Sequence, residues 1–245
     1  VELDVTADAG GVVHRTLRES GSRVEGGLPL IVGLKRDGEP GRVPIADDQI
    51  LPKDRIAIAT AGEASFNRIL RIFGHEQIDF PDRPRVVIFG AGLIGTRLAK
   101  AWLDSNAIVT VVESELETAN LLAGSDLGNK KNIEIIHGDH LDKDLLSEIE
   151  ISSQDLAISA LDNDHESIAA VLLASDMGVE RTGLILYDAD LVNVVRRMGI
   201  TFSVDRKRVA IDTILARIHS ELPGPYAVLS SVPDVIGICL PINTE

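Results

Sequence analysis

The sequence predicts an α/β protein, in which a doubly wound parallel Rossmann sheet is preceded by a small α+β module. An unbroken apolar run, Val86 to Phe89, leads directly into the glycine-rich turn Gly90 to Gly95. A carboxylate, Glu113, ends the next apolar run. From residue 85 to about 222, apolar strand-like segments alternate with helical ones. This alternation is typical of βαβ units, whose right-handed crossovers place helices on both faces of a parallel sheet.

The glycine-rich turn has the spacing of a dinucleotide-binding fingerprint. Gly90 allows the tight turn after the strand, Gly92 lets the backbone approach a pyrophosphate, and Gly95 lets the following helix pack close to the sheet. That helix, opening near Leu93, would direct free N–H groups and its positive end at the phosphates. Strand, turn, helix and acidic residue together indicate a nucleotide site more strongly than the glycines alone.

The remaining elements of this domain follow from apolar runs and helical periodicity. We expect strands at 108–112, 133–136, 156–160, 184–187 and 201–204. We expect helices at 93–103, 116–122, 141–149, 167–175, 189–197 and 209–219. The last helix has a broad apolar face formed by Val209, Ile211, Ile214, Leu215 and Ile218. This face either packs in the domain's own core or forms a subunit contact.

Residues 1–79 predict the small α+β module. Strands are expected at 1–5, 28–35, 42–45 and 55–60, and helices at 11–17 and 64–72. The proline-bounded segment 80–84 is the predicted linker to the Rossmann domain at 85–222. The tail at 223–245 contains one strand-like run, 235–240, with no evident partner, and it would begin a further small module.

Composition restricts the class of function. The 245 residues carry a formal net charge of −14, which argues against a nucleic-acid surface and against a polybasic membrane anchor. One cysteine excludes an internal disulfide framework and fits a reducing cytoplasm. No apolar run approaches the roughly 18–20 residues that span a bilayer, and the first residues do not resemble a signal peptide. We therefore expect a cytoplasmic protein that neither inserts into the membrane nor binds nucleic acid.

Several polar residues at predicted strand ends have two interpretations each. Glu113 either binds ribose hydroxyls, which favours NAD over NADP, or is the acid at the start of the next helix. Asp139 either lines the site by the adenine or forms a strand-end turn and caps the helix from Leu141, and the two roles are compatible. The acidic cluster at 162–166 lacks the glycine turn of a calcium loop; it either begins a helix, with Asn163 at the cap, which is favoured, or lines the nucleotide site. His137 and His140 lack further ligands for zinc, and no metal is expected.

The order of modules carries a resemblance. A small β-rich module and a linker precede a glycine-fingerprint domain, which has His137-Gly138-Asp139 after its third strand and Asp162-Asn163-Asp164-His165 after its fourth. This arrangement resembles the regulator-of-K⁺-conductance family, within it the TrkA-type peripheral subunits of Trk potassium uptake systems. In the resemblance, residues 1–79 correspond to a TrkA-C-like module and residues 85–222 to a TrkA-N-like domain.

The resemblance implies a non-catalytic regulatory protein that senses a nucleotide beside a membrane K⁺ transporter. It implies a homodimer or a tetrameric ring at the inner face of the membrane, with the last helix at the dimer contact and the Gly-Asp pair by the adenine. NAD(H) is the expected ligand, with ADP or ATP as alternatives. The fingerprint and the resemblance together give the expected binding residues, none of them catalytic: Gly90, Ala91, Gly92, Leu93, Ile94, Gly95, Glu113, Ser114, Asp139, His140, Leu161 and Asp162.

The chain departs from the family pattern where members carry polar or basic residues. Leu93 follows the second fingerprint glycine, Leu161 replaces a threonine, and Ile185 stands near the place of an arginine that faces the nucleotide. We therefore expect no large advantage of ATP over ADP. Two other functions stay open at this point: an NAD-dependent oxidoreductase, and a cytosolic gating domain of a K⁺ channel or antiporter. A catalytic acid–base set near a hydride site is not evident, which disfavours the oxidoreductase.

Overall fold

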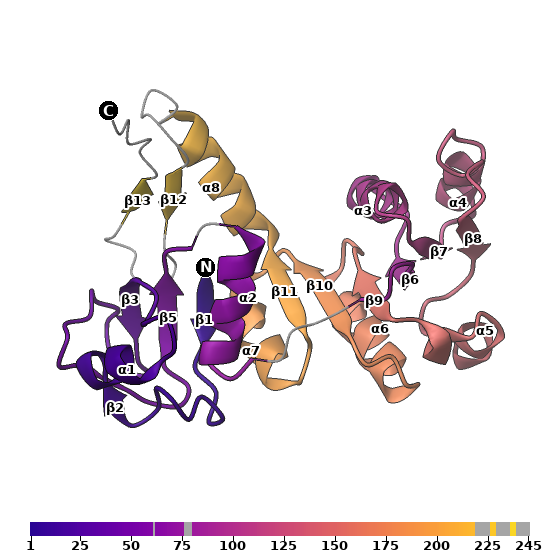
Figure 1. Ribbon diagram of the computed structural model, residues 1–245. Helices are drawn as coiled ribbons and strands as arrows, with labels where there is room; N and C mark the ends of the chain where they lie inside the picture. Colours follow the sequence, from indigo (N-terminus) through magenta and orange to yellow (C-terminus); the bar gives the residue numbers. More distant parts are fainter. Residues whose placement is uncertain (61, 76–79, 219–225, 229–235, 239–245) are drawn as a thin grey trace, which may run out of the picture. The chain divides into compact units, whose positions relative to one another are not determined.

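The computed structural model describes residues 1–60, 62–75, 80–218, 226–228 and 236–238. The chain divides into two compact units (Figure 1). One unit comprises Val1–Asp79 with Asp212–Glu245, and the other comprises Phe80–Ile211. The glycine fingerprint lies in the second unit.

The second unit is built on a six-stranded sheet in which every neighbouring pair is parallel. The strand order is β11-β10-β9-β6-β7-β8. Chain direction across the sheet therefore reverses at β6, which has β7 on one side and β9 on the other. In open α/β sheets a ligand binds at this reversal, outside the carboxyl ends of the strands. The bounds are β6 (Arg85–Phe89), β7 (Ile108–Glu113), β8 (Ile133–His137), β9 (Leu156–Ser159), β10 (Thr182–Leu186) and β11 (Phe202–Asp205).

Helices cover both faces of this sheet. Val86 and Ile88 of β6 pack in one cluster with Ala99 of α3 and Leu122 of α4, while Phe89 packs on the opposite face with α5 and α6 (Figure 1). Successive strand residues thus feed two cores, which explains why β6 is apolar throughout. The helices of this unit are α3 (Leu93–Asp104), α4 (Leu116–Ala123), α5 (Lys143–Glu148), α6 (Asp164–Asp176) and α7 (Ala189–Arg197), with a short 3₁₀ turn at Ile151–Ser153. Helix α8 (Arg206–Ile218) begins in this unit and ends in the other, because the boundary between the units falls after Ile211.

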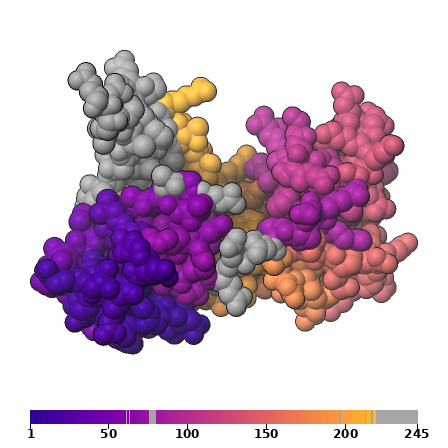
Figure 2. All heavy atoms as spheres, viewed as in Figure 1, coloured from indigo at the N-terminus to yellow at the C-terminus, as the bar shows by residue number. Residues whose placement is uncertain are grey.

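The prediction of a doubly wound parallel sheet is confirmed. In the space-filling view the magenta to salmon segment that carries β6 to α5 is one closely packed body (Figure 2). The sole tryptophan, Trp102 of α3, belongs to the first of the two cores and contacts Phe80 edge to face, with 5.6 Å between ring centroids. It therefore reports on the packing of α3 against β6.

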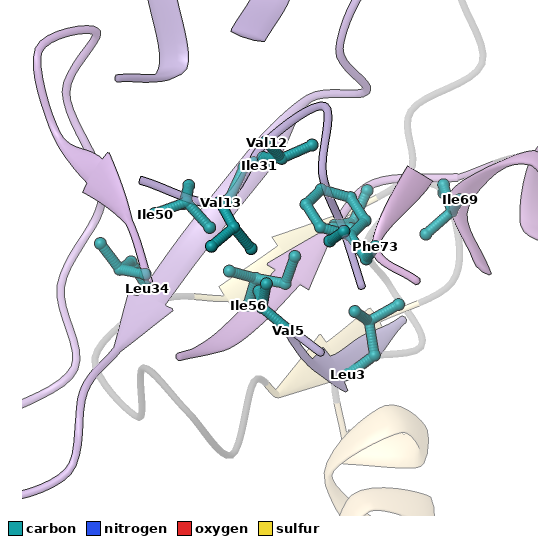
Figure 3. Packing of buried hydrophobic residues seen from close by; sticks show 12 residues of the cluster. Leu3, Val5, Val12, Val13, Ile31, Leu34, Ile50, Ile56, Ile69 and Phe73 are labelled. Atoms are coloured by element: carbon teal, nitrogen blue, oxygen red, sulfur yellow. The ribbon is translucent and has the colours of Figure 1, made fainter. Parts of the chain in front are cut away.

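The first unit contains an antiparallel sheet of β1 (Glu2–Asp4), β5 (Arg55–Ile58) and β3 (Ile31–Lys35), in the order β1-β5-β3. A second small sheet pairs β2 (Arg15–Thr16) with β4 (Gln49–Ile50). The helices are α1 (Leu17–Arg23) and α2 (Glu63–Ile72). Figure 3 shows Phe73, Ile56 and Val5 among the side chains of the core cluster, in which Phe73 and Ile56 are fully buried.

The helix predicted at 11–17 is wrong. The chain there forms turns and a short bridge, and His14 has a positive φ of 61°. The helix begins instead at Leu17, behind a capping box. Thr16 Oγ1 accepts a hydrogen bond from the Glu19 amide at 3.2 Å, and Glu19 Oε2 accepts from the Thr16 amide at 3.1 Å. The T-x-x-E spacing that marks such a start was present in the sequence.

The strand predicted at 42–45 is also wrong, since only Arg42 makes a bridge, to Leu34. Asp48 organises this segment instead. Its carboxylate accepts from Arg42 Nη1 at 2.5 Å and Nη2 at 2.7 Å, and from the Ile45 amide at 2.6 Å. The Arg42 hydrogen bond holds the pKa of the Asp48 carboxyl below its ordinary value. A side-chain clamp therefore replaces the expected backbone ladder.

The tail differs from expectation in one respect. The strand-like run at 235–240 contains β13 (Ile236–Ile238), for which the sequence showed no partner. It pairs antiparallel with β12 (Tyr226–Val228), so that Ala227 lies opposite Gly237. The rest of the tail lies outside the described residues.

Candidate nucleotide-binding site

The glycine-rich turn follows β6 at the point where the strand order reverses. Gly90 has a φ of 98°, in the left-handed region that favours glycine. A Cβ on Gly95 would lie 1.9 Å from the Gly90 carbonyl oxygen, so only glycine lets α3 pack this closely. A Cβ on Gly92 would meet nothing within 4 Å. The backbone at Gly92 is thus open on the side where a Cβ would project.

Gly92 is the N-cap residue of α3 and makes no side-chain cap hydrogen bond. The first N–H groups of a helix have no partner within the helix and are satisfied by caps, water or ligands. Leu93, the first residue of α3, is 70% exposed and brings no charge to this end. The turn therefore offers backbone amides and a helix dipole to an anionic group, with an apolar rather than basic neighbour.

Glu113 links the turn to the adjacent loop. The side chain is only 7% exposed. Its Oε2 accepts from the Ala91 amide at 2.6 Å, and its Oε1 accepts from the Glu115 amide at 2.8 Å. The carboxylate thus bridges the fingerprint and the β7–α4 loop. Neither sequence interpretation included this clasp, because it depends on which amides the fold brings to the end of β7.

The segment after β8 lies next to this clasp. The Gly138 amide donates to the Glu113 carbonyl at 2.9 Å, and His137 Nε2 lies 3.1 Å from the Ser114 carbonyl oxygen. His140 is only 6% exposed, and neither ring nitrogen has a hydrogen-bond partner among the described residues. Its ring centroid lies 6.4 Å from that of Phe89, at the end of β6.

Asp139 forms the predicted strand-end turn but does not cap the predicted helix. Its Oδ1 accepts from the Leu141 amide at 2.8 Å, which forms a local turn. Helix α5 begins two residues later than expected, at Lys143. Its N-cap is Asp142, whose Oδ1 accepts from the amides of residues 144 and 145 at 2.9 and 3.4 Å. Two aspartates within four residues competed for one cap, and the spacing to the first helical amides favours the later one.

The acidic cluster after β9 contains the expected cap. Asn163 Oδ1 accepts from the His165 amide at 2.9 Å and from the Glu166 amide at 3.3 Å, at the start of α6. Ahead of this cap, Leu161 lies beside the glycine turn, since a Cβ on Gly90 would approach Leu161 Cδ2 to 3.1 Å. Asp162 follows it in the same loop and is exposed. The helix starts at Asp164, three residues before the predicted boundary at 167.

Sequence reasoning missed two residues at this edge. The Tyr187 hydroxyl, one residue beyond β10, donates to Asp162 Oδ1 at 2.5 Å. Arg206, the residue after β11, donates to the Tyr187 hydroxyl and places its guanidinium carbon 4.5 Å from the centre of the tyrosine ring. The sequence analysis placed the arginine that the family directs at the nucleotide near position 185, on β10, where this chain has isoleucine. The sequence did contain one signal for Tyr187 and Arg206. Each directly follows the carboxyl end of a parallel strand, and all such ends meet at one edge of the sheet.

Comparison with known proteins identifies the domain. The TrkA-N domain model matches residues 86–205. This range runs from the second residue of β6 to the last residue of β11.

Residues 86–205 are a TrkA-N domain.

Relatives of the TrkA-N domain extend the match beyond it. The chain is 27% identical over 209 residues to the Trk system potassium uptake protein TrkA of Azorhizobium caulinodans, covering 84% of this chain and 44% of that protein. It is 29% identical over 178 residues to TrkA homolog 2 of Methanosarcina mazei, covering 71% and 37% respectively. The resemblance to TrkA-type proteins is confirmed. The chain spans less than half the length of these relatives.

A solved structure shows the same fold. The crystal structure of the GsuK RCK domain aligns with a TM-score of 0.51 at 18% identity, over 90% of this chain and 44% of that one. In the described ranges, no helix combines the length and apolar character needed to cross a bilayer.

Proposed function

We propose that this chain is the nucleotide-sensing part of a cytoplasmic regulatory subunit of a potassium uptake system, without catalytic activity of its own. The printed names of the TrkA relatives support the link to potassium uptake. The observation that carries the sensing role is the open helix end at Gly92 beside the buried Glu113. A regulatory subunit of this kind acts on a membrane K⁺ transporter by favouring one of two conformations when the ligand binds.

The proposed ligand is NAD(H), with ADP or ATP as alternatives. Its pyrophosphate would lie against Gly92 and the first amides of α3, with the adenosine ribose toward Glu113 and the β7–α4 loop. Ser114, Asp139 and His140 would surround the adenosine half. Although both Glu113 oxygens already accept backbone amides, a carboxylate oxygen has two lone pairs, so a ribose hydroxyl can still donate to it.

The first prediction tests nucleotide binding directly. Titration with NADH, NAD⁺ or ADP should raise the melting temperature, because a ligand that binds only the folded state stabilises it. At a concentration 100-fold above Kd the gain is about 2.7 kcal/mol. Differential scanning calorimetry with increasing ligand measures it, and guanosine nucleotides serve as the matched control. The absence of any shift with adenine nucleotides up to saturation would contradict the proposed function.

The proposed assembly is a homodimer through α8. Ile211, Ile214 and Ile218 share one face of this helix by their spacing and are 52%, 58% and 66% exposed. Of the two sequence interpretations of this face, core or subunit contact, their exposure favours contact. Adjacent exposed apolar residues on a helix indicate an interaction site. A two-fold contact would use the same face of both copies, and dimers could then assemble into a ring beneath the transporter.

Replacing an isoleucine of this face should dissociate the dimer. In Ile214→Asp or Ile218→Asp, an unpaired carboxylate would be buried at the contact. Multi-angle light scattering at tens of micromolar should show a dimer for the unmutated chain and a monomer for each variant. Thr213→Asp, almost opposite on the helix, adds the same charge and should stay dimeric. A monomeric unmutated chain, or variants that unfold instead of dissociating, would contradict the proposed contact.

A further inference from the structure

Three side chains from the ends of three neighbouring strands form a connected chain at the carboxyl edge of the sheet. Asp162 follows β9, Tyr187 follows β10 and Arg206 follows β11. The tyrosine hydroxyl donates to Asp162 and accepts from Arg206, and the arginine also lies over the tyrosine ring. The backbone amides of Tyr187 and Asp188 donate to Asp164, which fixes the loop that carries the tyrosine.

The hydrogen-bonded series Asp162–Tyr187–Arg206 lies on the opposite side of β6 from Glu113. The strand order places β7 and Glu113 on one side of the glycine turn and β9, β10 and β11 on the other. The loop after β9 adjoins the turn directly, since the Ala160 amide donates to the Phe89 carbonyl at 2.9 Å and a Cβ on Gly90 would lie 3.2 Å from the Ala160 oxygen. A dinucleotide with its adenosine at Glu113 and its pyrophosphate at Gly92 would therefore extend its other half toward the ends of β9 and β10, where the loop after β9 carries Asp162.

The chemistry of this edge suits a hydroxylated group better than a phosphate. Asp162 is exposed, whereas its neighbour Asp164 is engaged by backbone amides. A carboxylate accepts hydrogen bonds from the two hydroxyls of a ribose, and it repels the additional charge of a third phosphate. Tyr187 and Arg206 hold the carboxylate in one orientation, with the phenol between the two charges.

We infer that the Asp162 carboxylate accepts hydrogen bonds from the second ribose of a bound dinucleotide, and that Tyr187 and Arg206 are positioning residues for this carboxylate. This inference rests on the proposed function and adds a specificity: the site distinguishes ligands by what lies beyond the pyrophosphate. ADP-ribose has the second ribose, ADP ends before it, and ATP places a phosphate there. The affinity order is therefore ADP-ribose over ADP, and ADP at least equal to ATP.

Titration calorimetry with these three probes tests the inference on the complete chain. Asp162→Asn should weaken ADP-ribose about tenfold, as expected for the loss of a charged hydrogen bond, while the affinity for ADP stays within about twofold. The same variant should bind ATP more tightly, because a repulsive charge is removed. Tyr187→Phe keeps the ring and the arginine's contact with the ring face but removes the hydroxyl and its hydrogen bonds to Asp162 and Arg206, so it should weaken ADP-ribose about threefold.

Two matched controls remove the same charges nearby. Asp190 lies in the first turn of α7, and Lys207 is the neighbour of Arg206 in α8. The variants Asp190→Asn and Lys207→Gln should leave all three affinities unchanged. Arg206→Gln should reduce the preference for ADP-ribose, and Arg206→Lys should restore it in part. If none of the adenine nucleotides binds the unmutated chain, the proposed function fails and the inference with it. If ADP binds but ADP-ribose binds no tighter, or Asp162→Asn weakens both equally, only the inference is overturned.

Discussion

Gly95→Ala is expected to unfold or severely destabilise the TrkA-N domain. The added methyl group would lie 1.9 Å from the Gly90 carbonyl oxygen and 2.9 Å from its carbon, and both are backbone atoms that cannot rotate away. Helix α3 would have to separate from β6, which opens the core containing Val86, Ile88 and Ala99. We expect a loss of roughly 3 kcal/mol or more in the free energy of unfolding. Denaturant titration followed by Trp102 fluorescence measures it, because this residue lies on α3.

Gly92→Ala is the matched control within the same turn. Here the added methyl group meets no atom within 4 Å, and the backbone at φ −61° and ψ −173° is open to any residue. Stability should change by about 1 kcal/mol or less. Nucleotide affinity should nevertheless fall by about tenfold or more, because the methyl group occupies the approach of the pyrophosphate. Equal stability for Gly95→Ala and Gly92→Ala would refute the packing role assigned to Gly95.

Glu113→Gln is expected to affect stability and ligand selection together. The amide nitrogen of glutamine would face a backbone N–H, so either the Ala91 or the Glu115 amide loses its acceptor. Hydrogen bonds to a charged group contribute about 1.5–3 kcal/mol, and we expect a loss of about 2 kcal/mol. NAD⁺ should weaken more than NADP⁺, since the carboxylate that repels the 2′-phosphate is removed. Chemical denaturation and calorimetric titration measure the two effects.

Glu115→Gln removes the same charge two residues away from an exposed side chain. It should leave both the free energy of unfolding and the ratio of the two affinities unchanged. If Glu113→Gln lowers stability but weakens NAD⁺ and NADP⁺ equally, Glu113 acts only as a clasp between two loops. If stability is unchanged, the buried bridge contributes less than its two short hydrogen bonds indicate.

Prediction from sequence was most accurate where a segment's pattern depends on burial alone. The strands and helices from β6 to α8 were all expected, because a strand buried on both faces must be apolar throughout and a covering helix must repeat its apolar positions. It was least accurate in the small module. A helix was predicted at 11–17 although its start at Leu17 carried a capping box, and a strand was predicted at 42–45 where an Asp48 clamp holds the chain.

The candidate site divides in the same way. The glycine turn and Glu113 could be recognised from spacing along the chain, and their part in nucleotide binding stays a prediction. The cap of α5 is Asp142 and not Asp139, three residues earlier. Helical periodicity does not locate the start of a helix to within three residues. Tyr187 and Arg206 are separated from Asp162 by 25 and 44 residues of sequence, as their numbers show, and no local pattern relates them.

The sequence by itself determined the fold class and the place of the glycine turn, because backbone sterics and the burial of apolar side chains act over a few residues. Tertiary structure alone decided which groups meet at the carboxyl edge of the sheet. The order β11-β10-β9-β6-β7-β8 brings the ends of β9, β10 and β11 side by side, and so joins Asp162, Tyr187 and Arg206. It also brings the Ala91 amide, just beyond the end of β6, to the Glu113 carboxylate. These contacts follow from strand order, which is a property of the whole sheet.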